Sequence, residues 1–531
     1  MATAVDVLHS VDFTPHHLTD SVLTPDVQEF LVDLHRTFQP ARHVLLAHHA
    51  EAAQRFDDGE RPSFDPETAH IRSGEWHIAP PPFDLTNRRT ELTGPLQRGA
   101  MVEALNSGAS VFMADLEDTT TPTWDNILEG QANLRDAYAG TLTAVVDGEV
   151  RSPGSNPATL MVRTRGWHLD ESNMKIDGES MAASLFDFAV CAFLNSHPAI
   201  AAGTGPYFYL PKFEGAADAR LWSEVLEFTE ERLGLHRGTI RVTVLVETIA
   251  AAFEMDEILF ELRDHITGLH TGNWDYLFSI VKSFRNDPSF VLPDRADLSA
   301  TTPFIRSFTE LLISVCHRRG AHALGGMSGI VPDPINPDRT AAALRKVTVD
   351  KRREAGDGFD GTRIAHPAIV SLAEAEFDRV LSYRPNQVEF QRDDVYVTAG
   401  DLLATTTTRG KFTEDGLRRN LRIGLHYLGE WLAGTGAVAI DDHIEDLAMA
   451  ELCRVQIWQW RRHAIELTNG LTVDEQLIRR LADSERHDLR ESLGETVWSS
   501  GRFEEAFSLL LDLVLADELA DFIPHQIAGL R

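Results

Sequence analysis

The sequence predicts an α/β protein whose central part is a TIM (β/α)8 barrel, with helices before it and a C-terminal helical domain after it. The chain has 531 residues, more than one hydrophobic core usually organises. Short apolar runs alternate with helical stretches from about residue 96 to 385, the pattern of parallel strands and crossover helices. We therefore expect three parts, residues 1–95, 96–385 and 386–531.

Composition narrows the class of function. Hydrophobic residues make up 43% of the chain and charged residues 24%, as in ordinary globular proteins. The formal net charge is −32, from 81 acidic and 49 basic side chains, so the overall field repels nucleic acids and anionic membranes. We expect neither as a partner, although solubility alone also explains such a charge.

The cysteines and the N-terminus indicate a reducing compartment. Cys191, Cys316 and Cys453 lie far apart, with no CxxC pair or metal-ligand spacing. The first residues, Met1–Phe13, lack the basic start and apolar stretch of a secretory signal. No apolar run approaches the roughly 20 residues of a membrane helix. These features predict a cytoplasmic protein.

The N-terminal part reads as helices followed by an extended connector. Helical spacing begins near residue 15, and the segment Pro62–Pro82, with its Pro80-Pro81-Pro82 run, favours extended backbone. We place the first domain boundary near residue 95.

Functional side chains follow one predicted strand after another. The pairs of strand and following residues are Ser110–Ala114 with Asp115, Glu117 and Asp118; Thr159–Val162 with Arg163, Arg165 and His168; Val242–Val246 with Glu247; Ile266–Leu269 with Gly272 and Asp275; Ala321–Leu324 with Gly325-Gly326; and Thr362–Ala365 with His366-Pro367. One such case is usually a solvated charge in a loop. Because the carboxyl ends of barrel strands meet at one mouth, several cases in phase predict a common site.

Two acids are the candidate metal ligands. Glu247 and Asp275 would leave room for water and a chelating substrate on Mg²⁺, which prefers octahedral oxygen coordination. A third acid, which could be Asp115, Glu117 or Asp118, would bind the metal indirectly through its water ligands. The spacing of these acids matches no short metal motif, so the prediction depends on the barrel.

Backbone amides and arginines supply the candidate anion-binding groups. The segment Gly272–Asp275 contains a possible nest of N–H groups for a substrate carboxylate, or simply a turn. Arg165 is the preferred cation for stabilising an oxyanion. Arg163, two residues earlier, would face the same side if the strand continues, so the choice between them stays open.

Beyond about residue 400 the strand pattern fades. The segments Glu414–Trp431 and Ile444–Trp460 have apolar residues at helical spacing. Acids from Asp441 to Asp446 precede the second helix, where capping alone explains them well. The alternative is that Asp446 is a general base brought to the barrel mouth.

These residues resemble the malate synthases of the A type over nearly the whole chain. The blocks that carry the resemblance are Phe112–Asp118, Pro122–Trp124, Gly130–Asp136, Arg163–His168, Pro206–Lys212, Glu247–Glu257, Glu261–His265, Trp274–Tyr276, His322–Met327, Asp360–Thr362, Ala365–Pro367, Glu445-Asp446, Ala450-Glu451 and Trp458–Trp460. The resemblance implies an N-terminal helical clasp, a TIM barrel and a C-terminal helical plug.

The resemblance also implies an activity: Mg²⁺-dependent condensation of acetyl-CoA with glyoxylate, then hydrolysis of malyl-CoA to malate and CoA, in the glyoxylate cycle. The roles that it implies are Arg165 and Asp446 as catalytic pair, Glu247 and Asp275 as magnesium ligands, and Gly272, Asn273, Trp274 and Pro367 as substrate-binding residues. Both substrates are small molecules. The oligomeric state is open, with a monomer favoured.

Some positions depart from the family pattern. Arg363 stands where Trp is usual, Ala368 where Gly is usual, and Thr271 and Asn273 replace Cys and Arg. These departures put the affinity for substrate in question more than the type of reaction.

Two other functions are possible for such a barrel. One is a lyase that cleaves an acyl-CoA, but the presence of Asp446 in its sequence context argues against it. The other is a catalytically silent paralogue, which would be expected to have lost one of the proposed catalytic or metal-binding groups.

Overall fold

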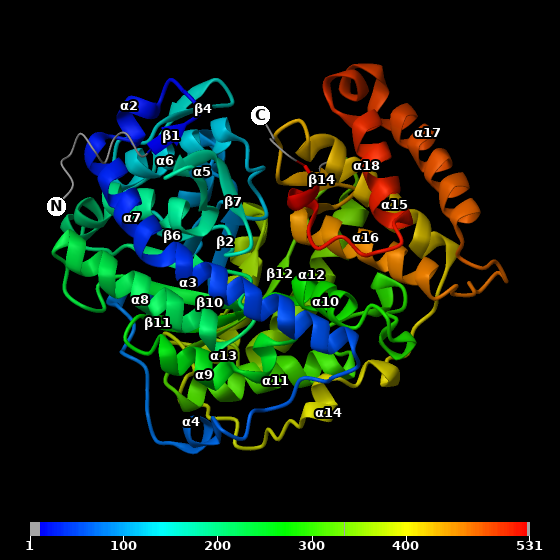
Figure 1. Cartoon of the computed structure of the whole chain (residues 1–531), viewed down its shortest axis with the longest axis horizontal. Coiled ribbons are helices and arrows are strands. Elements are labelled where there is room, and N and C mark those ends of the chain that lie inside the picture. The colour runs from blue at the N-terminus through cyan, green and yellow to red at the C-terminus, as the bar shows by residue number, and fades with distance from the viewer. Residues whose placement is uncertain (1–10, 334, 528–531) are drawn as a thin grey trace.

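The computed structural model describes residues 11–333 and 335–527 and has a closed barrel of parallel strands at its centre (Figure 1). Around the barrel the order is β2, β3, β6, β9, β10, β11, β12 and β13, and β13 closes on β2. Their bounds are Thr90–Gly94, Val111–Asp115, Thr159–Arg163, Tyr207–Leu210, Arg241–Val246, Ile266–Thr271, His322–Ser328 and Gly361–Ile364. The predicted fold class is confirmed. Residues 1–10, most of the stretch judged to lack a secretory signal, lie outside the description.

The first barrel strand begins before the boundary expected near residue 95. Strand β2 has Leu92 as its one large apolar residue, so no apolar run marks it in the sequence. On its inner face Glu91 accepts a hydrogen bond from Nε of Arg88 at 2.6 Å, and both side chains are fully buried. Because this strand carries a buried ion pair in place of apolar residues, the apolar pattern of the sequence did not predict it.

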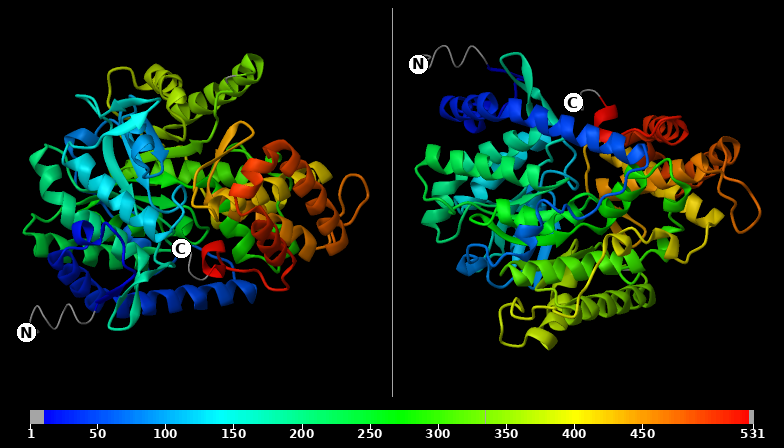
Figure 2. Two further views of the ribbon diagram at one scale, coloured as in Figure 1. Left: turned by 90° about the horizontal axis from the view of Figure 1, so that it is seen from above. Right: turned by 60° about the horizontal axis from the view of Figure 1, so that its bottom comes forward.

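Helices cover the outside of the barrel, mostly one or two after each strand (Figure 2). They are α5 Arg98–Leu105, α6 Trp124–Tyr138, α7 Ala183–Ala201, α8 Ala216–Leu233, α9 Met255–Glu261, α10 Asn273–Ser283, α11 Pro303–Arg318, α12 Pro337–Asp357 and α13 Val370–Leu381. Short hairpins, β4 Ala144–Val146 with β5 Glu149–Arg151 and β7 Asp170–Ile176 with β8 Glu179–Ala182, flank β6.

The N-terminal part packs against the outer surface of the barrel. Helix α3 (Pro25–Asp57) runs across the barrel and packs on α7 and α8 (Figure 1). Strand β1 (Val11–Phe13) adds to the edge of β7, and the short helices α2 (Thr19–Val22) and α4 (Ala69–Ser73) flank α3 in sequence. No helix of the described ranges is both long and apolar enough to cross a membrane.

The C-terminal part is mainly helical and lies beside the barrel mouth. Its helices are α14 Ala399–Leu402, α15 Glu414–Trp431, α16 Leu447–Arg462, α17 Glu475–Ser500 and α18 Phe503–Leu515. Helix α16 is buried between α15 and α10. The expectation of a helix from Ile444 was wrong at its start: Ile444 belongs to strand β15 (His443–Glu445), which pairs with β14 (Val438–Ile440). The amide of Ile444 also donates to the carbonyl of Gly329, 2.7 Å away, tying this hairpin to the barrel.

Candidate active site

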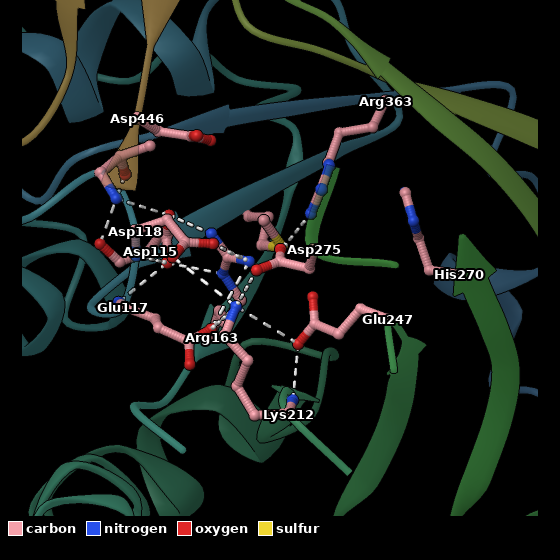
Figure 3. Close-up of polar contacts among 12 residues, drawn as sticks. Asp115, Glu117, Asp118, Arg163, Lys212, Glu247, His270, Asp275, Arg363 and Asp446 are labelled. Carbon is pink, nitrogen blue, oxygen red and sulfur yellow. Dashed lines mark hydrogen bonds and ion pairs between the residues drawn. The ribbon is translucent and has the colours of Figure 1, made fainter. Parts of the chain in front are cut away.

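Acids from four separate parts of the chain meet at the mouth of the barrel (Figure 3). Asp118 follows β3, Glu247 follows β10, Asp275 lies in the first turn of α10, and Asp446 precedes α16. All four side chains are buried. The amide of Leu447 donates to the carbonyl of Asp118 at 3.2 Å, which brings the C-terminal helix against the barrel loop.

Arg163 is the arginine that enters this cluster. It is the last residue of β6, and its Nε and Nη2 donate to the two carboxylate oxygens of Asp115, each at 2.6 Å. Its Nη1 lies 2.9 Å from Oδ2 of Asp118 but has no well-directed hydrogen bond in the described chain. Nη1 thus forms an ion pair with Asp118 and still lacks a well-directed acceptor, which a ligand at the mouth could supply.

Arg165 lies elsewhere. Its Nε and Nη2 donate to Asp187 of α7 at 2.9 and 2.7 Å, and its Nη1 is 2.9 Å from Glu171 of β7. Strand β6 ends at Arg163, so the alternation of side chains does not carry Arg165 to the same side. The structure brings Arg163, and not the preferred Arg165, to the acids.

Lys212 is a site residue that the sequence reasoning passed over. It follows β9, and its Nζ lies 2.7 Å from Asp275, 3.7 Å from Glu247 and 3.8 Å from Asp118. Burial lowers its pKa, but the surrounding carboxylates outweigh this and hold the pKa well above its ordinary value. The signal was present, because Lys212 follows a strand in the same phase as the other site residues.

The acids suit a hard cation. Oε2 of Glu247 and both carboxylate oxygens of Glu117 are buried and have no hydrogen-bond partner in the described chain. Unpartnered buried carboxylate oxygens are costly unless a cation accompanies them. Within residues 11–333 and 335–527 no three ligating side chains converge tightly enough to enclose a metal by themselves. Two protein ligands completed by water or substrate match Mg²⁺ best.

The start of α10 provides backbone donors next to these acids. Gly272 is the N-cap, and Asn273, Trp274 and Asp275 form the first turn, whose N–H groups lack intrahelical acceptors. A Cβ at Gly272 would lie 2.5 Å from Cβ of Glu247, so only glycine allows the two segments to approach. The helix N-terminus is thereby held against one candidate metal ligand.

Asp446 is both a helix cap and a perturbed acid. Its Oδ1 accepts a hydrogen bond from the amide of Met449 at 3.2 Å, so the capping role foreseen for this segment is real. Burial, together with the charges of Asp118 and Asp275, raises the pKa of Asp446 to about 8, although Arg163 and Arg363 pull it down. A carboxyl group with such a pKa can accept and return protons near neutral pH.

Two cavities reach the acids. One, of about 270 Å³, is lined by Lys212, Glu247 and Asp275 together with residues of α3 and the C-terminal segment. The other, of about 370 Å³, is lined by Trp274 and Asp446 among others. Pro367 lines neither; it is exposed in the turn Pro367–Ile369 after β13.

Comparisons with known proteins agree with the resemblance seen in the sequence. Family models described as malate synthase N-terminal domain, TIM barrel domain and C-terminal match residues 13–70, 159–405 and 411–529. The malate synthase of Streptomyces clavuligerus is 47% identical over 95% of this chain and 94% of its own. Malate synthase A of Escherichia coli (strain K12) is 44% identical over 94% of both chains.

Among solved structures, the magnesium and glyoxylate complex of the Haloferax volcanii malate synthase aligns with 79% of this chain and 99% of its own, at 14% identity and a TM-score of 0.46. The sequence relatives match nearly end to end and at high identity. The chain therefore belongs to the malate synthase family of enzymes.

Proposed function

We propose that this chain condenses acetyl-CoA with glyoxylate and hydrolyses the resulting malyl-CoA to malate and CoA, using Mg²⁺ held by Glu247 and Asp275. The observation that carries the proposal is the convergence of Asp446, Arg163 and these two acids at one mouth (Figure 3). The relatives of 44–47% identity are named malate synthases, which supports the same reaction.

Asp446 is the proposed general base. Its carboxylate takes a proton from the methyl group of acetyl-CoA, a step favoured by its raised pKa. Asp446 lines the cavity of about 370 Å³ beside Trp274, so a methyl group entering there would meet the carboxylate directly.

Arg163, rather than Arg165, is the proposed oxyanion-stabilising group. The pairing with Asp115 fixes its guanidinium, so Nη1, which has no well-directed acceptor in the described chain, would stabilise the developing enolate oxygen without reorganisation. Arg165 is instead proposed to brace the loop after β6 through Asp187.

The acceptor is proposed to bind between the metal ligands and the start of α10. Mg²⁺, when bound, polarises the aldehyde of glyoxylate as a Lewis acid. The amides of Asn273, Trp274 and Asp275 would receive its carboxylate, as helix N-termini do with anions. Pro367 lies apart from this region, and we propose for it only a contact with the outer part of acetyl-CoA.

We also propose that the enzyme acts as a monomer in the cytoplasm and serves the glyoxylate cycle. The three cysteines are buried and unpaired in the described chain, which suits a reducing compartment.

The test is release of the CoA thiol from acetyl-CoA by purified protein. We expect release that requires glyoxylate, is sustained by Mg²⁺, stops with EDTA, and yields malate. Release without malate, or no release from folded protein, would replace this proposal with another acyl acceptor or a non-catalytic role.

A further inference from the structure

Arg363 is a buried cation that no carboxylate of the described residues contacts directly. It is the third residue of β13, its side chain is 6% exposed, and it points into the barrel mouth towards the acids (Figure 3). Among the residues that the structure describes, its side chain makes one polar contact, from Nη1 to the sulfur of Met113 at 3.8 Å, and its Nε has no partner. Within residues 11–333 and 335–527 no carboxylate lies within 4.0 Å of its guanidinium.

Other buried arginines of the described chain are each satisfied by oxygen. Arg88 pairs with Glu91 at 2.6 Å, Arg319 with Asp256 at 2.8 Å and Arg454 with Glu451 at 2.5 Å. Arg241 has no carboxylate but donates to backbone carbonyls, including that of Pro80. A sulfur at 3.8 Å is a poor substitute, and a buried charge without a direct oxygen partner is unfavourable. The substrate-free protein therefore holds Arg363 at a cost in stability.

The neighbours of Arg363 do not remove that cost. His270 lies beside it, fully buried, with Nε2 unpartnered, and burial and the charge of Arg363 keep its pKa well below the ordinary value. A neutral imidazole supplies no negative charge. Asp446 and Asp275 face the same space but neither comes within 4.0 Å of the guanidinium. The charge of Arg363 lowers the pKa of Asp446, but its guanidinium keeps donors that a ligand in the mouth can fill directly.

The depth of Arg363 limits the size of that ligand. Its side chain lies inside the barrel, against Met113 of the inner apolar cluster, rather than on the outer turn that carries Pro367. A small carboxylate suits this position, because guanidinium and carboxylate form short, charge-assisted hydrogen bonds.

We propose that Arg363 is a further substrate-binding residue, which binds a carboxylate oxygen of the α-oxo acid acceptor and sets the affinity for that acceptor. This inference rests on the proposed function, since the acceptor is the small anion of that reaction. Arg363 acts on binding of the acceptor and leaves proton removal from acetyl-CoA to Asp446.

The test compares Arg363→Met, which keeps the length and removes the charge, with Arg363→Lys, which keeps the charge. Binding of glyoxylate is measured by calorimetry with Mg²⁺ and without acetyl-CoA, and KM is measured separately for each substrate. For Arg363→Met we expect affinity for glyoxylate to fall about 10- to 100-fold, the value of a charged hydrogen bond, with KM for acetyl-CoA unchanged. Arg363→Lys should retain part of that affinity. Unchanged binding of glyoxylate by Arg363→Met would overturn the inference.

The control is Arg352→Met in α12, which removes an arginine that is 58% exposed and pairs with Glu376. It should leave both KM values unchanged. Without ligand, Arg363→Met should also melt at the same or a higher temperature than the natural protein, because an unpaired buried charge has gone. A lower melting temperature with equal loss of affinity for both substrates would assign Arg363 a structural role and overturn the inference. If the natural protein binds glyoxylate but forms no malate, the proposed function fails while the calorimetric comparison still decides the role of Arg363.

Discussion

Arg163 and Asp115 are joined by two parallel hydrogen bonds of 2.6 Å, and this fork fixes the guanidinium at the end of β6. Arg165 forms a comparable pair of hydrogen bonds with Asp187 of α7, and this pair does not include the acids of the barrel mouth. Two arginines separated by one residue therefore have different surroundings. Arg163 faces the cluster of acids at the barrel mouth, and Arg165 joins the loop after β6 to α7.

This difference predicts different effects for Arg163→Lys and Arg165→Lys. The first keeps a positive charge but loses the planar donor aimed at the mouth, so kcat should fall on the order of 100-fold or more, as for an oxyanion donor. The second should lower the melting temperature and leave kcat within a few fold. Steady-state kinetics and thermal unfolding of both variants check this. Equal loss of kcat in the two would contradict the assignment.

The barrel could be predicted because six short stretches, apolar or β-branched for the most part, are each followed by residues of functional type. β2 could not, since its inner face carries Glu91 paired with Arg88 rather than an apolar residue. The convergence of Glu247 and Asp275 follows from barrel topology alone. The choice of Arg163 does not, because it depends on the strand ending at that residue.

The residue pattern left the role of Asp446 open between a cap and a base, and only the family resemblance favoured the base. A capping acid and a catalytic acid look alike in a sequence, and here the same carboxylate caps α16 and lies among the mouth acids. The packing of α16 against α10 places this carboxylate beside the acids of the barrel mouth, which supports the proposed base role. Arg363 shows the same limit, since a lone arginine in a strand gives no sign that it lacks a partner.

Asp446→Asn should fold normally and lose activity. Asparagine caps helices as well as aspartate does, so the amide of Met449 keeps its acceptor. Without a base, kcat should fall at least about 100-fold. Far-ultraviolet circular dichroism and the thiol-release assay measure the two properties, and full activity in this variant would remove Asp446 from the base position.

The pH profile should report the same carboxylate. Burial first, then Asp118 and Asp275, raise the pKa of Asp446 to about 8 in the metal-free protein, and a bound cation lowers it again. Because the base acts as a carboxylate, kcat should fall as the pH drops through this pKa. The acid limb should lie above 3.8, the ordinary value for Asp, and below about 8. A kcat that stays constant from pH 3.8 to 9 would contradict this.

Glu247→Gln should weaken the dependence on Mg²⁺ specifically. The substitution keeps the shape of a fully buried side chain but removes the carboxylate charge, and Oε2 of this carboxylate has no hydrogen-bond partner among the described residues. The Mg²⁺ concentration for half-maximal activity should rise at least about 10-fold, and calorimetry should show weaker Mg²⁺ binding. Glu224→Gln, at an exposed position of α8, is the matched control and should behave like the natural protein. Equal Mg²⁺ affinity in both variants would exclude Glu247 as a ligand.

His49 of α3 joins the N-terminal part to the barrel through a contact that depends on pH. Its Nε2 lies 3.2 Å from Oδ2 of Asp218 in α8, and the two side chains are 19% and 1% exposed. Burial lowers the pKa of His49, but the hydrogen bond and charge of Asp218, with the charge of Glu214, outweigh it and raise the pKa to about 9. The folded protein therefore keeps His49 protonated at pH values where the unfolded chain releases the proton.

A raised folded-state pKa stabilises the fold at low pH and loses its effect at high pH. The stabilisation from His49 should be complete below pH 6.5, the unfolded value, and disappear as the pH rises through about 9. His49→Gln should accordingly lower the melting temperature by about 2 °C at pH 6 and by little at pH 9.5. The neighbouring His48→Gln, at an exposed position, should change the melting temperature at neither pH. A difference for His49→Gln that stays constant from pH 6 to 9.5 would mean that packing, and not the charge on His49, makes the contact.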